Sequence, residues 1–107
     1  SFDILAQDFD FIFICDNFGE VVGRCIVAPP REAIFGFIID SRYRHKGYGK
    51  KLLQYVIDTY TGTLKLDTSN TLFFYVAESL GFKYAETTID EITKLPTLKM
   101  IRKEDEK

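Results

Sequence analysis

Tryptophan is absent from this sequence, and histidine, the commonest metal ligand and a frequent general acid or base, occurs only once. The two cysteines form no CxxC motif, and neither stands at a zinc-like spacing from the histidine. No apolar run approaches the roughly 20 residues of a membrane span, and the chain does not open with a basic segment and an apolar core. We therefore expect a cytoplasmic protein with no bound metal ion and no membrane partner.

What remains is the composition of a folded protein. Hydrophobic residues make up 46% of the chain and aromatic residues 15%, with ten Phe and six Tyr. A chain of 107 residues is long enough for one hydrophobic core and too short for two. Residues 1–107 are therefore expected to form a single domain.

The cysteines can be placed on a predicted hairpin. The segment ICDNFGEV is typical of a strand, a turn and a second strand, with the bend at residues 16–19. Pairing across that bend places Cys15 opposite Glu20 and Cys25 opposite Asp10, so no disulfide is expected. Two buried thiols in a reducing compartment are the simpler interpretation.

The apolar periodicity predicts six strands and two helices. The run AIFGFII reads as a central strand buried on both faces, and the helix after it carries apolar residues at helical spacing until Gly62. Thr68, Ser69 or Asn70 can cap a second helix that ends at Gly81. The expected fold is an α/β (α+β) mixed, mostly antiparallel sheet with a right-handed parallel strand–helix–strand crossover at its centre. The strands are expected at residues 10–15, 20–28, 33–39, 63–67, 82–88 and 97–102.

Positive charge is concentrated between the central strand and the first helix. The formal net charge is −2, yet residues 41–51 hold five cations and no acid, which leaves nine basic against 16 acidic residues elsewhere. These cations are Arg42, Arg44, Lys46, Lys50 and Lys51. A local cluster favours a compact anion over a long nucleic-acid track.

The same turn contains Gly47 and Gly49 and leads into a helix N-terminus. Unpaired N–H groups at a helix start carry about half a positive charge, and glycine lets an anion approach them closely. A Walker loop is excluded because Lys50 is followed by Lys51 and no glycine lies five positions before Gly49. A GxGxxG dinucleotide motif is excluded because position 52 is Leu.

The segment RHKGYG resembles the R/Q-x-x-G-x-G/A signature of the GNAT acyl-CoA-dependent N-acyltransferases. The likeness extends upstream, where Ile39 and Ser41 stand at the positions of the family's V-x-P-like segment, and downstream to Asn70 and the Gly81-Phe82 pair. The expected strand order agrees from about residue 10 to 102. The chain thus resembles a short form of the family, without the strand and two helices that usually precede the first hairpin.

This resemblance implies acetyl-CoA as the acyl donor and an amine as the acceptor. The CoA pyrophosphate would lie on the backbone from Arg44 to Lys50, and the pantetheine arm along the strand end from Phe37 to Ile39. The Ile39 N–H would polarise the thioester carbonyl, and Asn70 would hydrogen-bond the same arm. The implied CoA-binding residues are Phe37, Ile39, Arg44, His45, Lys46, Gly47, Tyr48, Gly49, Lys50 and Asn70.

The general acid and base are less clear from the resemblance. Many members have a Tyr four residues before the glycine of the closing GF, but this chain has Ala77 there. Tyr75 is the nearest alternative, although two residues turn a helix by about 200°, and solvent is the other proton source. Glu32, at the start of the central strand, is the candidate base, unless the amine arrives already neutral.

The acceptor is an amine of a small molecule, a protein N-terminus or a lysine. Because so little sequence precedes the first hairpin, the chain is shortened, its acceptor cleft is open, or a second subunit of a homodimer covers it. Two other classes remain as alternatives: a CoA-binding sensor or interaction module of the same fold without catalysis, and a nucleic-acid binder that uses the basic turn.

Overall fold

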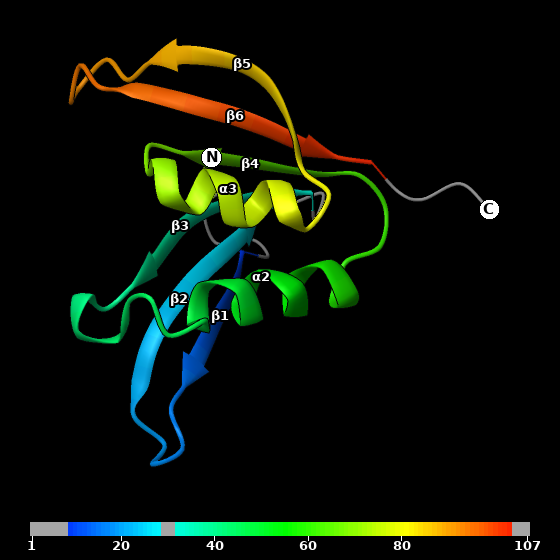
Figure 1. Cartoon of the computed structure of the whole chain (residues 1–107). Coiled ribbons are helices and arrows are strands. Elements are labelled where there is room, and N and C mark those ends of the chain that lie inside the picture. Colours follow the sequence, from blue (N-terminus) through cyan, green and yellow to red (C-terminus); the bar gives the residue numbers. More distant parts are fainter. Residues whose placement is uncertain (1–8, 29–31, 104–107) are drawn as a thin grey trace, which may run out of the picture.

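The computed structural model describes residues 9–28 and 32–103. Its elements follow one another in the predicted order, β-β-β-α-β-α-β-β, with a short 3-10 helix added after the third strand (Figure 1). They are β1 (Asp10–Cys15), β2 (Val21–Ala28), β3 (Ala33–Ile39), η1 (Ser41–Tyr43), α2 (Tyr48–Thr59), β4 (Leu64–Thr68), α3 (Thr71–Ser79), β5 (Lys83–Ile89) and β6 (Pro96–Arg102).

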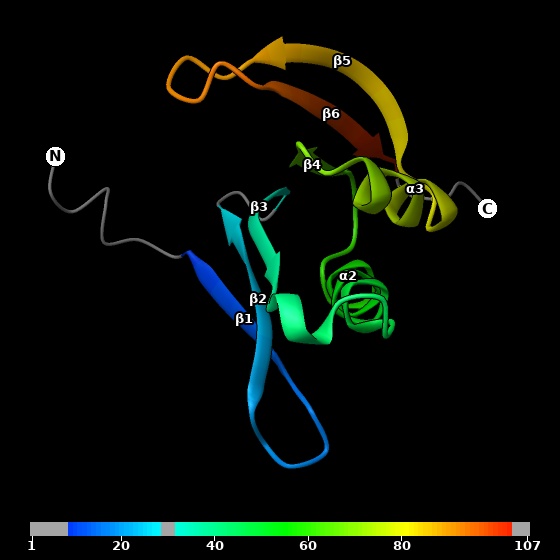
Figure 2. The same ribbon diagram turned by 60° about the vertical axis from the view of Figure 1, so that its left-hand side comes forward.

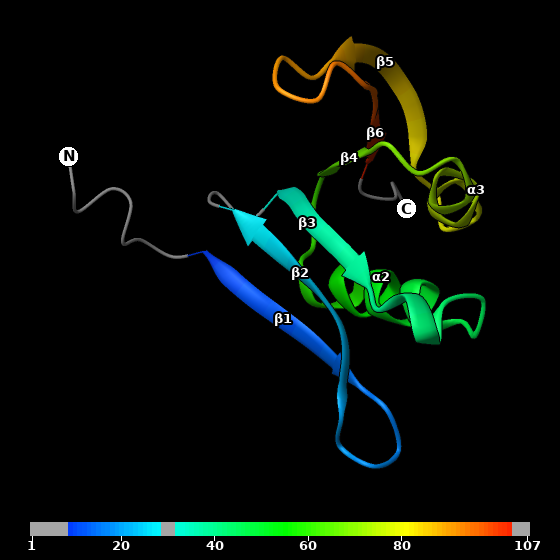
Figure 3. The ribbon, with the colours of Figure 1, turned by 90° about the vertical axis from the view of Figure 1, so that its left-hand side faces the viewer.

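All six strands form one sheet in the order β1-β2-β3-β4-β6-β5. The pair β3 and β4 is parallel and is joined through α2, while every other neighbouring pair is antiparallel. The predicted mixed sheet with one central parallel crossover is therefore confirmed. Figures 2 and 3 show both helices on the same side of the sheet.

The core lies between this face of the sheet and the two helices. The apolar stripe of α2 buries Leu52, Leu53 and Val56, and α3 contributes Ala77. Sheet residues complete the cluster: Cys25, Val27, Ile34, Leu64, Leu66, Met100 and the adjoining Phe82. Burial of this apolar surface fixes the strand that precedes the basic turn and the helix that follows it.

The prediction that β3 is buried on both faces is wrong. Ile34 is buried against the helices, whereas Phe35 and Ile38 are exposed on the opposite face. The reason is that α2 and α3 both pack on one side of the sheet. An uninterrupted apolar run thus occurs in a strand with a covered face and an open face.

The expected cysteine pairing is also corrected. Cys15 lies opposite Val21 and Cys25 opposite Ile12. The hairpin closes one residue later than predicted, where the Asp16 N–H donates to the Glu20 carbonyl, and the register shifts once more between Ile14 and Cys15. Cys25 is buried as expected, but Cys15 is exposed, and both are free thiols. The absence of a bond between them agrees with the prediction, although the predicted register was wrong.

Candidate functional site

The basic turn begins where β3 ends, and its first cation is bound within the protein. The Asp40 carboxylate accepts hydrogen bonds from the Arg42 backbone N–H at 2.9 Å and from its Nη2 at 3.0 Å. The Arg42 guanidinium therefore holds the pKa of Asp40 below its usual range. Asp40 caps η1, so Arg42 anchors the turn and its charge is largely compensated.

The turn then enters α2 through left-handed backbone at two residues. His45 has φ of +64° and Gly47 has φ of +87°. Gly47 is the N-cap of α2 and supplies no side-chain cap, so the first N–H groups of the helix receive no side-chain acceptor there. A Cβ added at Gly47 would meet nothing within 4 Å. The helix start is therefore sterically open to an anion.

A bulge in β3 decides which side chains face the helices. The pairing register with β2 shifts between Arg24 and Ile26, which adds one residue to β3 around Gly36, whose φ is +61°. Strict alternation would place Gly36 on the face of Ile34, but the bulge places Phe37 there instead. The Arg24 Nη1 donates to the Gly36 carbonyl at 3.0 Å and ties the bulge to β2.

Beyond this bulge β3 separates from β4. The two strands pair only at Ala33 with Lys65 and at Ile34 with Leu66, and they diverge toward their carboxyl ends (Figure 1). The opening left between them lies beside the basic turn. Among the described residues, no strand pairs with the backbone groups on that side of β3 near its end.

Ile39 is the last residue of β3, and its backbone points into this opening. The Asp40 N–H donates to the Val22 carbonyl at 2.8 Å. Since successive residues of an antiparallel strand alternate in direction, the N–H and C=O of Ile39 point away from β2. The Ile39 carbonyl accepts a hydrogen bond from Arg44 Nε at 3.0 Å. Arg44 thus joins the turn to the strand end.

The start of α3 forms the other wall. Asn70 is the N-cap, and its Oδ1 accepts from the Leu72 N–H at 2.9 Å and the Phe73 N–H at 3.1 Å. Of the three candidate caps, Asn70 is therefore the one used. The Phe73 ring lies 4.3 Å from the Phe37 ring, centroid to centroid. This contact closes the base of the opening between α3 and β3.

These walls enclose a cavity of about 560 Å³. Nine of the ten residues predicted to bind CoA line it, and Lys46 is the exception. The lining residues are Phe37, Ile38, Ile39, Tyr43, Arg44, His45, Gly47, Tyr48, Gly49, Lys50, Thr68, Asn70, Leu72, Phe73 and Val76. The structure thus brings together the strand end, the basic turn and the start of α3.

The candidate acid and base lie outside this cavity. Tyr75 is 62% exposed and packs edge-on against Phe74, with 5.5 Å between ring centroids. Ala77, at the position of the family's Tyr, is buried in the core. Glu32 precedes the opposite end of β3, where its Oε1 lies 3.3 Å from Lys65 Nζ. Lys46 is exposed in the turn.

Sequence reasoning missed several residues of the site. Tyr43, Thr68, Phe73 and Val76 line the cavity but read as ordinary turn or helix residues. Arg24 is separated from Gly36 by twelve positions in the sequence, and no local pattern links them. The sequence offered only one indication of the Arg24–Gly36 contact, which is an arginine in the strand that precedes a glycine-containing apolar run.

Two further observations limit the kinds of site in the described part of the chain. No group of three or more His, Cys, Asp or Glu side chains is placed there to hold a metal ion. Neither α2 nor α3 is long and apolar enough to cross a membrane.

Comparison with known proteins agrees with this geometry. The model of the acetyltransferase (GNAT) family matches residues 2–82, and the chain belongs to that family. Enzymes of this family use acetyl-CoA as the acyl donor. No curated protein matches the chain significantly in sequence.

Several solved structures share the fold. The ribosomal-protein-S18-alanine N-acetyltransferase from Escherichia coli superposes with a TM-score of 0.77 at 23% identity, covering 95% of this chain and 73% of that one. An aminoglycoside 6'-N-acetyltransferase complexed with coenzyme A gives 0.70 at 15% identity, covering 98% and 78%. The IAA acetyltransferase from Bacillus cereus gives 0.70 at 18% identity, covering 79% and 71%. At these identities the likeness shows the fold alone.

Proposed function

We propose that this protein is an N-acetyltransferase that moves an acetyl group from acetyl-CoA to a primary amine by direct attack of the amine on the thioester. The observation that carries the proposal is the single cavity that joins the end of β3, the basic turn and the start of α3. The family's signature and its strand–turn–helix context occur together at that cavity.

The turn residues suit the pyrophosphate of CoA. The uncapped N–H groups at the start of α2 are donors for phosphate oxygens, and the open space at Gly47 admits them. A Cβ at Gly49 would come within 3.7 Å of the Phe73 ring and 3.8 Å of Ile39, so glycine also widens the passage toward β3. Lys50 lines the cavity and adds positive charge, and His45 lines it beside the turn.

The strand end suits the pantetheine arm and the thioester. Among the described strands none pairs with the outward backbone groups of Phe37 or with the Ile39 N–H, whereas the Ile39 carbonyl is held by Arg44 Nε. An extended arm can therefore pair with Phe37 and the Ile39 N–H like an added strand. The Ile39 N–H would donate to the thioester carbonyl as negative charge develops on its oxygen. Asn70 uses its Oδ1 for the helix cap, which leaves its Nδ2 as the donor toward the arm.

The two proton transfers of the reaction need no side chain of the protein, because the amine can arrive already neutral and water can protonate the departing thiolate. Tyr75 could act as the general acid only if its ring left Phe74 and turned toward the cavity, because it is absent from the cavity lining. Glu32 is held by Lys65 at the far end of β3 and is a poor candidate for a base. An amine that reaches the site neutral needs neither group, and water can protonate the departing thiolate.

A second hollow gives the acceptor a route to the thioester. It has a volume of about 670 Å³, and Gly36 and Asp67 line it together with four residues of the first cavity: Phe37, Thr68, Asn70 and Leu72. The two hollows therefore meet at the opening between β3 and β4. The acceptor, whether a small molecule, a protein N-terminus or a lysine, would approach from this side.

The main alternative is a domain of the same fold that binds CoA without transferring acetyl groups. The buried Ala77 and the position of Tyr75 outside the cavity favour it. Thiol release from acetyl-CoA should be measured with a panel of amines, alongside calorimetric titration with CoA. Amine-dependent thiol release supports the enzyme, whereas micromolar CoA binding without turnover on any amine supports the alternative.

A nucleic-acid binder is disfavoured because cations of the basic turn are already paired within the protein. Arg42 is paired with Asp40 and Arg44 donates to the Ile39 carbonyl, so two of the five cations of the turn already have partners in the protein. DNA or RNA binding that weakens steeply with salt would support this class, and no binding at low salt would dismiss it.

A further inference from the structure

Thr68 is the last residue of β4, and it lines both hollows of the proposed site. Side chains alternate along a strand, so Thr68 is on the same face as Leu64 and Leu66, which are buried under the helices. Thr68 itself is half-buried. Four described residues line both hollows, and Thr68 is the one among them that carries a hydroxyl. These four are Phe37, Thr68, Asn70 and Leu72.

The strand register places Thr68 across the opening from Phe37. The parallel strands β3 and β4 pair at Ile34 with Leu66. Two residues further along, β4 reaches Thr68, while β3, with the extra residue of its bulge, reaches Phe37. A pantetheine arm that pairs with the end of β3 would lie between the two strands. Thr68 would then be on the side of the arm that faces β4.

The hydrogen bonds of Thr68 hold its oxygen and leave its proton available. Oγ1 accepts from the Asn70 backbone N–H at 3.0 Å. Among the described residues, the hydroxyl proton has one acceptor in reach, the Asn70 carbonyl, and the 3.5 Å between the two oxygens exceeds the range of about 2.5–3.0 Å for such bonds. That carbonyl already accepts from the Phe74 N–H at 3.0 Å. The hydroxyl is therefore a positioned donor without a committed acceptor.

We propose that the Thr68 hydroxyl donates a hydrogen bond to the CoA sulfur as the thiolate leaves. This inference rests on the proposed acetyl transfer, in which the amine nitrogen bonds to the carbonyl carbon, the C–S bond breaks and its electron pair stays on sulfur. The surplus proton of the amine goes to water, and water supplies the proton that completes the thiol. An alcohol is a far weaker acid than a thiol, whose pKa is about 8.5. Thr68 therefore stabilises the thiolate without giving up its proton.

The other hydroxyls of the CoA cavity are on its pyrophosphate side. They belong to Tyr43 and Tyr48, whose rings lie edge to face in the basic turn with 6.0 Å between centroids. The Ile39 N–H would bind the carbonyl oxygen, and the Thr68 hydroxyl would bind the sulfur. The two donors thus stabilise successive sites of negative charge, first the oxygen of the tetrahedral intermediate and then the thiolate.

Three substitutions at Thr68 test its role as a donor. Thr68→Ser keeps the hydroxyl and should keep most of kcat. Thr68→Val is nearly isosteric but has no donor, so kcat should fall about tenfold, the lower end of the effect of a hydrogen bond to a charged group. The space vacated in Thr68→Ala can admit a water molecule that donates instead, so its loss of kcat should be smaller than that of Thr68→Val. The affinity for acetyl-CoA should stay the same, because the thioester sulfur is uncharged.

A purely structural role predicts a different order of the variants. Thr68→Val and Thr68→Ala both lose the acceptor of the Asn70 N–H, and valine is favoured over alanine in a strand. Thermal melts should therefore rank Thr68→Val at or above Thr68→Ala, whereas kcat should rank them in reverse. If kcat follows the melting temperature across the three variants, the proposal is wrong.

The thiol pKa of bound CoA measures the donor without any turnover. The thiolate absorbs in the ultraviolet more strongly than the thiol, so a pH titration of the complex gives this pKa after subtraction of a complex with a CoA analogue that lacks the sulfur. A tenfold stabilisation of the thiolate corresponds to about one pKa unit. The pKa should therefore be about one unit higher in Thr68→Val than in the wild type.

The difference between these two titrations reports on Thr68 because the other charged groups and the helix start are common to both proteins. The titratable groups that line the two hollows are Tyr43, Arg44, His45, Tyr48, Lys50 and Asp67. The N-terminus of α3 also favours a thiolate, and it too is unchanged.

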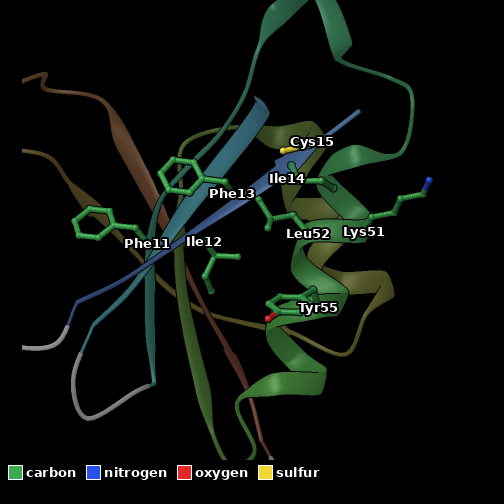
Figure 4. Close-up of a pocket in the computed structure, with 8 residues that line it drawn as sticks. All are labelled: Phe11, Ile12, Phe13, Ile14, Cys15, Lys51, Leu52 and Tyr55. Atoms are coloured by element: carbon green, nitrogen blue, oxygen red, sulfur yellow. The ribbon is translucent and has the colours of Figure 1, made fainter. Parts of the chain in front are cut away.

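Tyr55→Phe is the control for the loss of a hydroxyl. Tyr55 lines a separate hollow between β1 and α2 that shares no lining residue with the CoA cavity (Figure 4). This variant should have the kcat and the bound-thiol pKa of the wild type.

The outcomes separate the role of Thr68 from the proposed function. A wild-type thiol pKa in Thr68→Val would overturn the role of Thr68, whatever the kcat of that variant. A wild-type protein that binds CoA but transfers no acetyl group to any amine would overturn the proposed function alone, since the titration still decides whether Thr68 binds the sulfur. No binding of CoA would overturn both.

Discussion

Gly47 offers the sharpest test of the anion site, because two nearly isosteric substitutions differ there only in charge. Its φ of +87° is a conformation that both Asn and Asp tolerate better than most residues, and a Cβ would meet nothing within 4 Å. Gly47→Asn and Gly47→Asp should therefore carry the same backbone cost. Only Gly47→Asp places a carboxylate where we propose that the pyrophosphate lies.

The magnitude of this effect follows from Coulomb's law. Two unit charges 4 Å apart interact by about 1 kcal/mol in water and about 4 kcal/mol near a protein surface. Taking about 1–3 kcal/mol for this open turn, Gly47→Asp should bind acetyl-CoA about 5- to 150-fold more weakly than Gly47→Asn. The difference should shrink at high salt because the site is accessible to counter-ions.

Calorimetric titration with acetyl-CoA at low and moderate salt measures both affinities. A thermal melt of each variant provides the control, since the two should unfold at similar temperatures. Equal affinities for Gly47→Asn and Gly47→Asp would refute the placement of the pyrophosphate at this turn.

Three further predictions concern other parts of the chain. Asn70→Ala removes the cap of α3 and should lower the free energy of unfolding by about 1 kcal/mol, or about 4–8 °C in Tm. Asn70→Asp keeps the cap and should melt like the wild type, but it should bind acetyl-CoA more weakly because the amide donor is lost. Equal acetyl-CoA affinity in Asn70→Asp and wild type would exclude the donor role. Arg24→Met removes the hydrogen bond to the Gly36 carbonyl and should lower kcat/KM for acetyl-CoA about tenfold in a thiol-release assay, and Arg24→Lys should recover part of this loss. Loss of stability without loss of activity would show that Arg24 has a purely structural role. Burial raises the pKa of the Cys25 thiol from 9.0 to about 11, so as the pH rises the thiol ionises in the unfolded chain before it ionises in the folded one. The free energy of unfolding should therefore fall between pH 9 and 11 relative to that of Cys25→Ala. Denaturant titrations of both proteins at several pH values measure this difference, and parallel pH profiles would contradict the prediction.

Most of the secondary structure could be predicted because apolar periodicity and helix caps are local signals. Every strand begins and ends within one residue of its predicted bounds. The turn was recognisable because Gly47, Gly49 and the cations are adjacent in the sequence. Asn70 was identified as one of three possible caps, since a short polar side chain before an apolar helix has a local function.

The features that were missed depend on contacts between distant residues. The bulge at Gly36 is invisible in an unbroken apolar run, because it is a shift in pairing with β2. The hydrogen-bond acceptors of Arg42 and Arg44 could not be inferred from the charge pattern, since an exposed arginine can reach many acceptors. The open face of β3 follows from both helices packing on the same side, which periodicity within one strand does not reveal.

The central claim is that CoA binds between the end of β3, the basic turn and the start of α3. The most direct test is a titration of the ¹⁵N-labelled protein with CoA, followed by the backbone amide signals. The largest shift changes should fall at residues 37–39, 44–50 and 68–73, with little change in β5 and β6. Changes concentrated on β1, β5 or β6, or no saturable change at millimolar CoA, would contradict the account.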